Sequence, residues 1–221
     1  PMKNCTLVRG FLFAGACALA LTARAQVIEF RATINAAQEV PATTTAATGS
    51  AIMLYDIGAN TFDLVLSISN FTNTLTDAHI HEAAAGATAS PLVHFPLTAF
   101  TKTGNTVTAT IRGTAYTGDK LKLLQSGAYV NFHSAAFPNG EVRGQLIGQP
   151  KRLVANMTVA QEQAACPAVN LAGANLNDFG AAVMFYDPAA NRISLRLSVY
   201  NFNNTLNNSH FHEGAPGVSG G

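Results

Sequence analysis

The sequence predicts an all-β protein, built as a Greek-key β-sandwich or barrel. About eight short apolar runs lie between residues 27 and 148, and turn-forming residues separate them every 8–12 positions. Apolar and polar residues alternate strictly from Phe62 to Ile68, which is the period of a strand with one buried face. Only the segment from Asp119 to Gln125 has a helical pattern, so a fold of alternating strands and helices is not expected.

The first half of this region contains four predicted strands. Val27 to Asn35 alternates apolar and polar residues. Ser50 to Tyr55 is continuously apolar, which is typical of a strand buried on both faces. The alternating strand from Phe62 to Ile68 follows a turn, and a histidine-rich strand from Thr76 to Glu82 comes next.

The second half contains four further predicted strands. They are Leu92 to Phe95, Thr106 to Arg112, Ala128 to Ser134 and Glu141 to Ile147. The sequence Pro138-Asn139-Gly140 predicts the turn between the last two, because these residue types favour tight turns.

Residues 1–25 are predicted to be a secretory signal peptide, cleaved before Gln26. Lys3 and Arg9 precede an apolar run that is too short for a membrane anchor, and Ala23-Arg24-Ala25 fits a cleavage site. Without this segment the chain has 10 basic and 12 acidic residues, with no basic block. Nucleic acid is therefore not an expected partner, and the protein is expected to be secreted or periplasmic.

The chain repeats part of itself at an offset of 131 residues. Residues 49–86 and 180–217 share 20 identities in 38 positions without a gap. We therefore expect a first domain at 27–148, a linker at 149–152 and a second copy at 153–221. The second copy has no counterpart of the later strands, so the chain is expected to be a fragment of a longer protein. Cys166 is the only cysteine after residue 25, so no internal disulfide is expected and its role stays open.

The histidines form the most distinctive pattern. His79 and His81 alternate along one strand, so they share a face and can reach one metal ion. The same H-x-H-E recurs at His210 and His212, followed by Glu213 as Glu82 follows His81. His94 and His133 lie at other predicted strands of the first domain. These residues are candidate ligands for copper, with zinc less favoured, and the alternative is that they are hydrogen-bonded groups without a metal. Glu82 faces away from the pair and is expected to accept a hydrogen bond from a turn amide.

Two segments resemble a known family. The sequence H-I-H-E-A-x-x-G at His79 and the sequence from Ala128 to Leu146, with N-G-E-V-R-G-Q, are similar to the CHRD domain, named from chordin. The resemblance covers residues 28–148 and the front half of a second copy from 153 to 221. It implies an exported all-β module, often in tandem, without an established catalytic activity.

A weaker similarity is to copper/zinc superoxide dismutase, in the order of H-x-H, a single histidine 13 residues later, and a late histidine before a glycine-flanked arginine. On this resemblance His79, His81, His94 and His133 would be copper ligands, and Arg143 would guide an anion. The zinc-binding loop and the disulfide of that enzyme are absent from residues 26–150. The implied fold is superoxide dismutase-like, with an immunoglobulin-like sandwich as the alternative.

The sequence thus supports two main functions. The first is an exported, non-enzymatic binding module that holds copper or another transition metal, or an extracytoplasmic protein or matrix ligand. The second is a copper redox enzyme related to the dismutases. A purely structural or adhesive scaffold is a third possibility. Neither a hydrolytic arrangement nor a phosphate-binding loop is present, so hydrolysis and nucleotide binding are not expected.

Overall fold

The computed structural model describes residues 27–159, 161, 177–203, 205, 209 and 211. The predicted signal peptide, Cys166, His210 and His212 lie outside the described residues, so the predictions for them stay open. None of the helices in the described part of the chain is long and apolar enough to cross a membrane.

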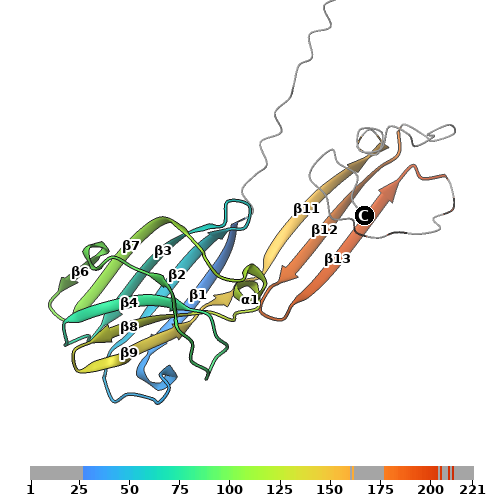
Figure 1. Cartoon of the computed structure of the whole chain (residues 1–221). Coiled ribbons are helices and arrows are strands. Elements are labelled where there is room, and N and C mark those ends of the chain that lie inside the picture. The colour runs from blue at the N-terminus through green and yellow to red at the C-terminus, as the bar shows by residue number, and fades with distance from the viewer. Residues whose placement is uncertain are drawn as a thin grey trace, which may run out of the picture.

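The first region is one curled antiparallel sheet in the form of a half-barrel, which confirms the all-β prediction (Figure 1). Its strands are β1 (Val27–Asn35), β2 (Thr48–Asp56), β3 (Thr61–Ser69), β4 (Leu75–His81), β5 (Pro91–His94), β6 (Phe100–Thr103), β7 (Thr106–Ala115), β8 (Tyr129–Ser134), β9 (Phe137–Gln145) and β10 (Ile147–Gly148). They follow the order β5-β4-β8-β9-β1-β2-β3-β7-β6, and β10 pairs with β1.

Three short helical segments connect these strands. They are η1 (Ala36–Gln38), η2 (Leu97–Ala99) and α1 (Lys120–Leu124). Asp119 caps α1, because its side chain accepts a hydrogen bond from the backbone N–H of Leu121 at 2.8 Å. The sequence predicted this helix within one residue at each end.

The core lies inside the curl of the sheet. Alternate residues of β1, β2 and β3 point into it, and residues of β4, β8 and β9 cover them from the other part of the sheet. On β4 the core residues are Ala78 and Ile80, and on β8 they are Val130 and Phe132. Because side chains alternate along a strand, the histidines of β4 and β8 occupy the opposite face.

Three local predictions were wrong. Strand β2 is buried on one face only, because Ile52 and Leu54 are exposed on the other. The reversal between β8 and β9 falls at residues 135–136, so Pro138 to Gly140 belong to strand β9. Strand β6 was not predicted, because its sequence from Phe100 to Thr103 is short and mostly exposed.

A separate sheet follows β10, and it contains β11 (Lys151–Thr158), β12 (Phe179–Asp187) and β13 (Arg192–Tyr200) (Figure 1). Strands β12 and β13 begin and end 131 residues after β2 and β3, and they pair in the same register. Thr48 lies opposite Ser69, for example, and Phe179 lies opposite Tyr200. The sequence repeat is therefore also a repeat of local structure, whereas its assignment as a second domain stays a prediction.

Candidate metal centre

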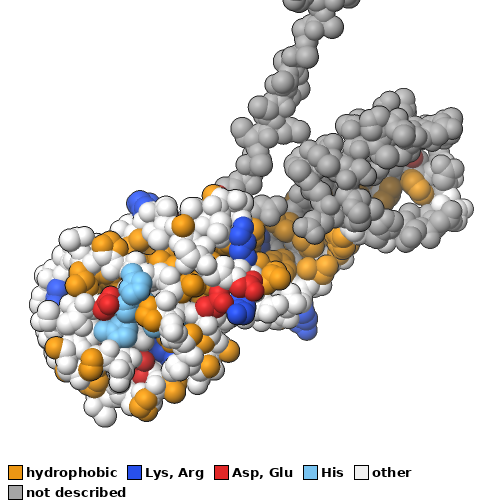
Figure 2. Space-filling view, viewed as in Figure 1, with side chains coloured by type: hydrophobic (Ala, Val, Ile, Leu, Met, Phe, Trp, Pro, Cys, Tyr) orange, Lys and Arg blue, Asp and Glu red, His pale blue; other side chains and the backbone are white. Residues whose placement is uncertain are grey.

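The outer face of strands β4, β5 and β8 brings the histidines of the first region together. The strands pair antiparallel, with His79 opposite His94 and Asp77 opposite His133. Side chains at paired positions lie on the same face of a sheet. The cluster is visible as a histidine patch next to an acidic side chain on the surface of the first region (Figure 2).

Three of the four candidate histidines of the first region converge. One ring nitrogen each from His79, His81 and His133 lies within 4.8 Å of the others. Their side chains are buried, with residue exposures of 4%, 5% and 9%. Histidines so well covered by protein need partners for their ring nitrogens, because an unpaired buried polar group is costly.

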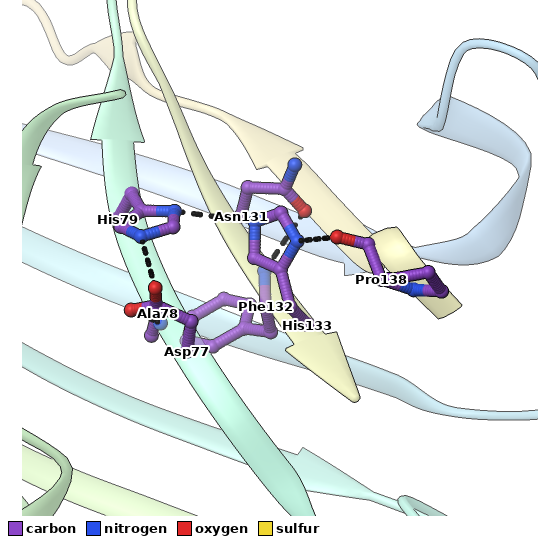
Figure 3. Close-up of polar contacts among 7 residues, drawn as sticks. All are labelled: Asp77, Ala78, His79, Asn131, Phe132, His133 and Pro138. Atoms are coloured by element: carbon purple, nitrogen blue, oxygen red, sulfur yellow. Dashed lines mark hydrogen bonds and ion pairs between the residues drawn. The ribbon is translucent and has the colours of Figure 1, made fainter. Parts of the chain in front are cut away.

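Two of the rings have their outer nitrogen, Nδ1, against a backbone carbonyl, and this contact fixes their tautomers. His133 Nδ1 lies 3.0 Å from the carbonyl oxygen of Pro138, and His81 Nδ1 lies 2.8 Å from that of Ala89 (Figure 3 shows the first contact). A carbonyl oxygen can only accept, so each Nδ1 carries the ring proton. In the neutral rings the Nε2 atoms of His81 and His133 therefore present lone pairs. His81 Nε2 is buried and has no hydrogen-bond partner among the described residues.

His79 faces an acceptor on each side. Its Nδ1 lies 3.2 Å from the Nε2 lone pair of His133, and its Nε2 lies 2.9 Å from Oδ2 of Asp77 (Figure 3). Only the Nδ1 contact has hydrogen-bond geometry, so a neutral ring that donates its proton to His133 leaves a bare Nε2 lone pair beside the carboxylate. A second proton or a metal cation at Nε2 would offset the repulsion between this lone pair and the carboxylate.

The electrostatics disfavour the second proton. Burial is the largest effect on His79 and lowers its pKa below the usual 6.5, although Asp77 acts in the opposite direction. Burial also lowers the pKa of His81, and the neighbouring His79 and His133 add to this effect. The rings of His79 and His81 are thus held in the neutral form, which is the form that binds a metal ion.

His94 does not join this group, contrary to the predicted convergence of four histidines. It is exposed on β5, and its ring packs against the ring of His79 with the centroids 4.4 Å apart. A nitrogen of His94, a nitrogen of His79 and a carboxylate oxygen of Asp77 form a second group within 4.8 Å. The reason is the pairing of the strands, because β5 and β8 lie on opposite sides of β4.

Buried polar side chains continue from the cluster across β8 and β9. The ring of Tyr129 stacks on His81, with the centroids 4.8 Å apart, and the guanidinium of Arg143 lies over the ring of Tyr129. Arg143 itself is buried. Its Nε donates to the carbonyl of Gln38, and its Nη1 donates to that of Ala87 at 2.8 Å. Arg143 thereby holds two connecting segments over this face, and its predicted role in guiding an anion stays a prediction.

Glu39 is a second buried charged residue near Arg143. Burial raises the pKa of its carboxyl group from 4.5 to about 7, and the charge of Arg143 acts against this effect. Oε1 of Glu39 has no hydrogen-bond partner among the described residues. Gly140 lies beside it with a φ of 125°, which side chains rarely adopt, and a Cβ at this position would lie 2.8 Å from both carboxylate oxygens.

Sequence reasoning missed two residues of this face. Asp77 lies two positions before His79, so the alternation of a strand already places it with the histidines. Glu39 belongs to the sequence Ala37-Gln38-Glu39, which recurs 123 residues later, but nothing in the pattern indicates that it is buried. Glu82 behaves as predicted, because its Oε2 accepts from the backbone N–H of Asp119 at 2.7 Å.

The fold and the site define an all-β module with a buried histidine cluster on the outer face of its sheet. Comparison with protein families identifies a CHRD domain at residues 30–146, which is more than half of the chain. The chain therefore belongs to the CHRD domain family, which occurs in extracellular proteins and indicates an extracellular binding module. Neither the comparison with curated proteins nor that with solved structures finds a match.

Proposed function

We propose that this CHRD domain binds one transition-metal ion, copper in preference to zinc, through Nδ1 of His79 and Nε2 of His81 and His133. The observation that carries the proposal is the orientation of the three rings. The outer nitrogens of His81 and His133 face backbone carbonyls, and that of His79 faces a carboxylate. The inner nitrogens of His79 and His133 are 3.2 Å apart, and one nitrogen of each of the three rings lies within 4.8 Å of the others. This is the usual arrangement around metal-bound histidines, whose second nitrogen interacts with a carbonyl or carboxylate.

The spacing of the nitrogens supports the same proposal. Two ligands at about 2.05 Å from a metal, in tetrahedral geometry, lie about 3.3 Å apart. Nδ1 of His79 and Nε2 of His133 are 3.2 Å apart, so an ion can bind them with little movement. Three imidazole ligands suit copper or zinc, and copper binds such nitrogen ligands more tightly than zinc does.

The surroundings of the three histidines favour metal binding without catalysis. The ligands are buried, and Arg143 is bonded to backbone carbonyls at the covering segments. The family itself indicates a binding module. A macromolecular partner would be an extracytoplasmic protein or a matrix component, in keeping with an exported protein.

The test measures metal binding to the full chain purified without a histidine tag and with Cys166→Ser, so that neither adds a ligand. Copper(II) and zinc are titrated separately, and bound metal is measured after gel filtration. The variant is His81→Ala/His133→Ala, and the matched control is His210→Ala/His212→Ala, which removes as many histidines. The proposal predicts that the first pair of substitutions abolishes tight copper binding and that the control retains it. Equal copper content in the two variants would contradict it.

A further inference from the structure

The ring of His79 lies between two groups of metal-binding side chains. On one side are His81 and His133, and on the other side are Asp77 and His94. His79 Nδ1 faces the first group, and its Nε2 faces the carboxylate in the second. The two nitrogens of one ring are thus directed toward different groups.

We propose that Asp77 and His94 hold a second divalent transition-metal ion, and that His79 bridges it to the ion in the buried site. This inference rests on the proposed function, because His79 belongs to both sites. The bridging ring would bind the buried ion through Nδ1 and the outer ion through Nε2. When the second ion binds, the proton of His79 leaves to solvent, and the ring becomes a bridging imidazolate.

The contact between Asp77 and His79 supports a metal more than a hydrogen bond. Oδ2 of Asp77 is 2.9 Å from Nε2, yet the contact lacks hydrogen-bond geometry, and Nε2 is buried without such a partner among the described residues. Two ligands at a right angle on one ion, each bonded at about 2.05 Å, are about 2.9 Å apart. The carboxylate therefore does not occupy the lone-pair direction of His79 Nε2. It lies to the side of this direction, where a second ligand of the same metal ion would lie.

The remaining ligands are positioned for the same ion. The other carboxylate oxygen of Asp77, Oδ1, accepts a hydrogen bond from the backbone N–H of Ala78 at 2.9 Å, which orients Oδ2 toward the ring. His94 is the paired residue of His79 on the neighbouring strand, and its ring contacts that of His79. A carboxylate and two imidazole nitrogens form a common ligand set for copper or zinc.

The two sites differ in their exposure to solvent. The residues of the inner site are at most 9% exposed, whereas His94 is exposed and the side chain of Asp77 is 47% exposed. The outer ion would keep water as a ligand and would exchange faster than the inner ion. We therefore expect the inner site to fill first and the outer site to fill second.

The experiment counts copper ions and measures their magnetic coupling. It uses the full, tag-free chain with Cys166→Ser and His210→Ala/His212→Ala, so that only the first region supplies histidine ligands. Copper(II) is added in steps, and retained copper and the electron paramagnetic resonance intensity are recorded. The variant is Asp77→Asn/His94→Ala, and Asp63→Asn is the charge-matched control, because Asp63 is an exposed carboxylate away from the histidines.

We expect two retained ions, with a resonance intensity that rises with the first ion and falls with the second as the bridged spins couple. The Asp77/His94 variant should retain one ion at full intensity, and the Asp63 control should behave as the parent does. One ion in both parent and variant would overturn the second site and leave the proposed function intact. Two uncoupled ions would overturn the bridge, and no retained ion would overturn both proposals. Circular dichroism of each protein confirms that the sheet is formed.

Discussion

Strands β2 and β3 of the first region and β12 and β13 of the second have the same lengths and the same register but differ in burial. On β3 the inward side chains are at most 3% exposed, and they are Phe62, Leu64, Leu66 and Ile68. Their counterparts on β13 are 41–52% exposed, and they are Ile193, Leu195, Leu197 and Val199. One sequence pattern thus forms the same strand pair in two surroundings.

The difference shows what a core requires beyond an amphipathic strand. In the first region β4, β8 and β9 complete the curl of the sheet and cover the inward face of β3. Among the described residues of the second region, the sheet consists of β11, β12 and β13. Full burial of a leucine or isoleucine side chain contributes about 1.5–3 kcal/mol, and a half-exposed one contributes correspondingly less.

The largest expected effect concerns independent folding. Residues 27–149 produced alone should unfold in one cooperative thermal transition, because they contain a complete core. Residues 150–221 alone should show no such transition, since the apolar side chains of the strands described there are largely exposed. Circular dichroism as a function of temperature measures both. Cooperative melting of the second segment would mean that it forms a core of its own.

A matched pair of leucines tests the comparison at single residues. Leu64→Ala should lower the free energy of unfolding by about 2–5 kcal/mol, because it leaves a cavity in a closed core. Leu195→Ala removes an exposed side chain and should cost less than about 1 kcal/mol. Denaturant unfolding of the full chain, with hydrogen exchange to assign each transition to its region, measures the two losses. Equal losses would show that the second sheet is covered in solution.

Metal binding should also distinguish the regions. His79 and His81 have His133 beside them, whereas no histidine follows His212 in the 221 residues. Copper at 100 times its dissociation constant should stabilise the first region by about 2.7 kcal/mol. His79→Ala/His81→Ala should abolish this gain and His210→Ala/His212→Ala should retain it, as measured by the melting temperature. A gain lost only in the second variant would reverse the comparison.

The pH dependence of the same gain has a defined sign. Burial lowers the pKa of His79 and His81 from 6.5, so protons compete with the metal for these two rings only below that value. In the metal-free protein these groups contribute stability above pH 6.5 that is lost as the pH falls through their lowered pKa values. In the Asp77→Asn/His94→Ala variant, which keeps only the inner site, copper-dependent stabilisation should therefore be constant from pH 8 to 7 and should decline in acid. A decline that begins above pH 7 would be inconsistent with neutral, buried ligands.

The smallest expected effect concerns Glu39. Its carboxyl pKa is raised to about 7, so the folded state binds this proton more tightly, and stability falls as the pH rises from 4.5 to 7. Glu39→Gln should therefore increase the free energy of unfolding at pH 8 by about 1–2 kcal/mol, below the roughly 3 kcal/mol that the full shift allows. The gain should vanish at pH 4. Denaturant unfolding at both pH values measures it.

The corresponding substitution in the second region sharpens this test. Glu162 occupies the matching position of the repeated A-Q-E sequence and lies outside the described residues. A gain at pH 8 equal to that of Glu39→Gln would indicate that the second region builds the same buried surroundings.

The sequence by itself determined most of the strands, the repeat and the pairing of His79 with His81, but it did not indicate β6 or the start of β9. These features depend on local alternation, which two or three neighbouring residues define. The same alternation implies that Asp77 shares the face of the histidines, although the sequence analysis did not single it out, and the length of the helical pattern limited α1 to a short segment.

Only the tertiary structure decided which distant residues join the pair. His94 and His133 look equivalent along the chain, yet strand order places them on opposite sides of β4, and only His133 faces both His79 and His81. Arg143 is buried by segments that are far away in sequence. The same kind of non-local packing decides the burial of Glu39 and the exposure of one face of β2. The physical reason is that alternation specifies a face, whereas the packing of non-local strands and loops decides whether that face meets water, core or another ligand.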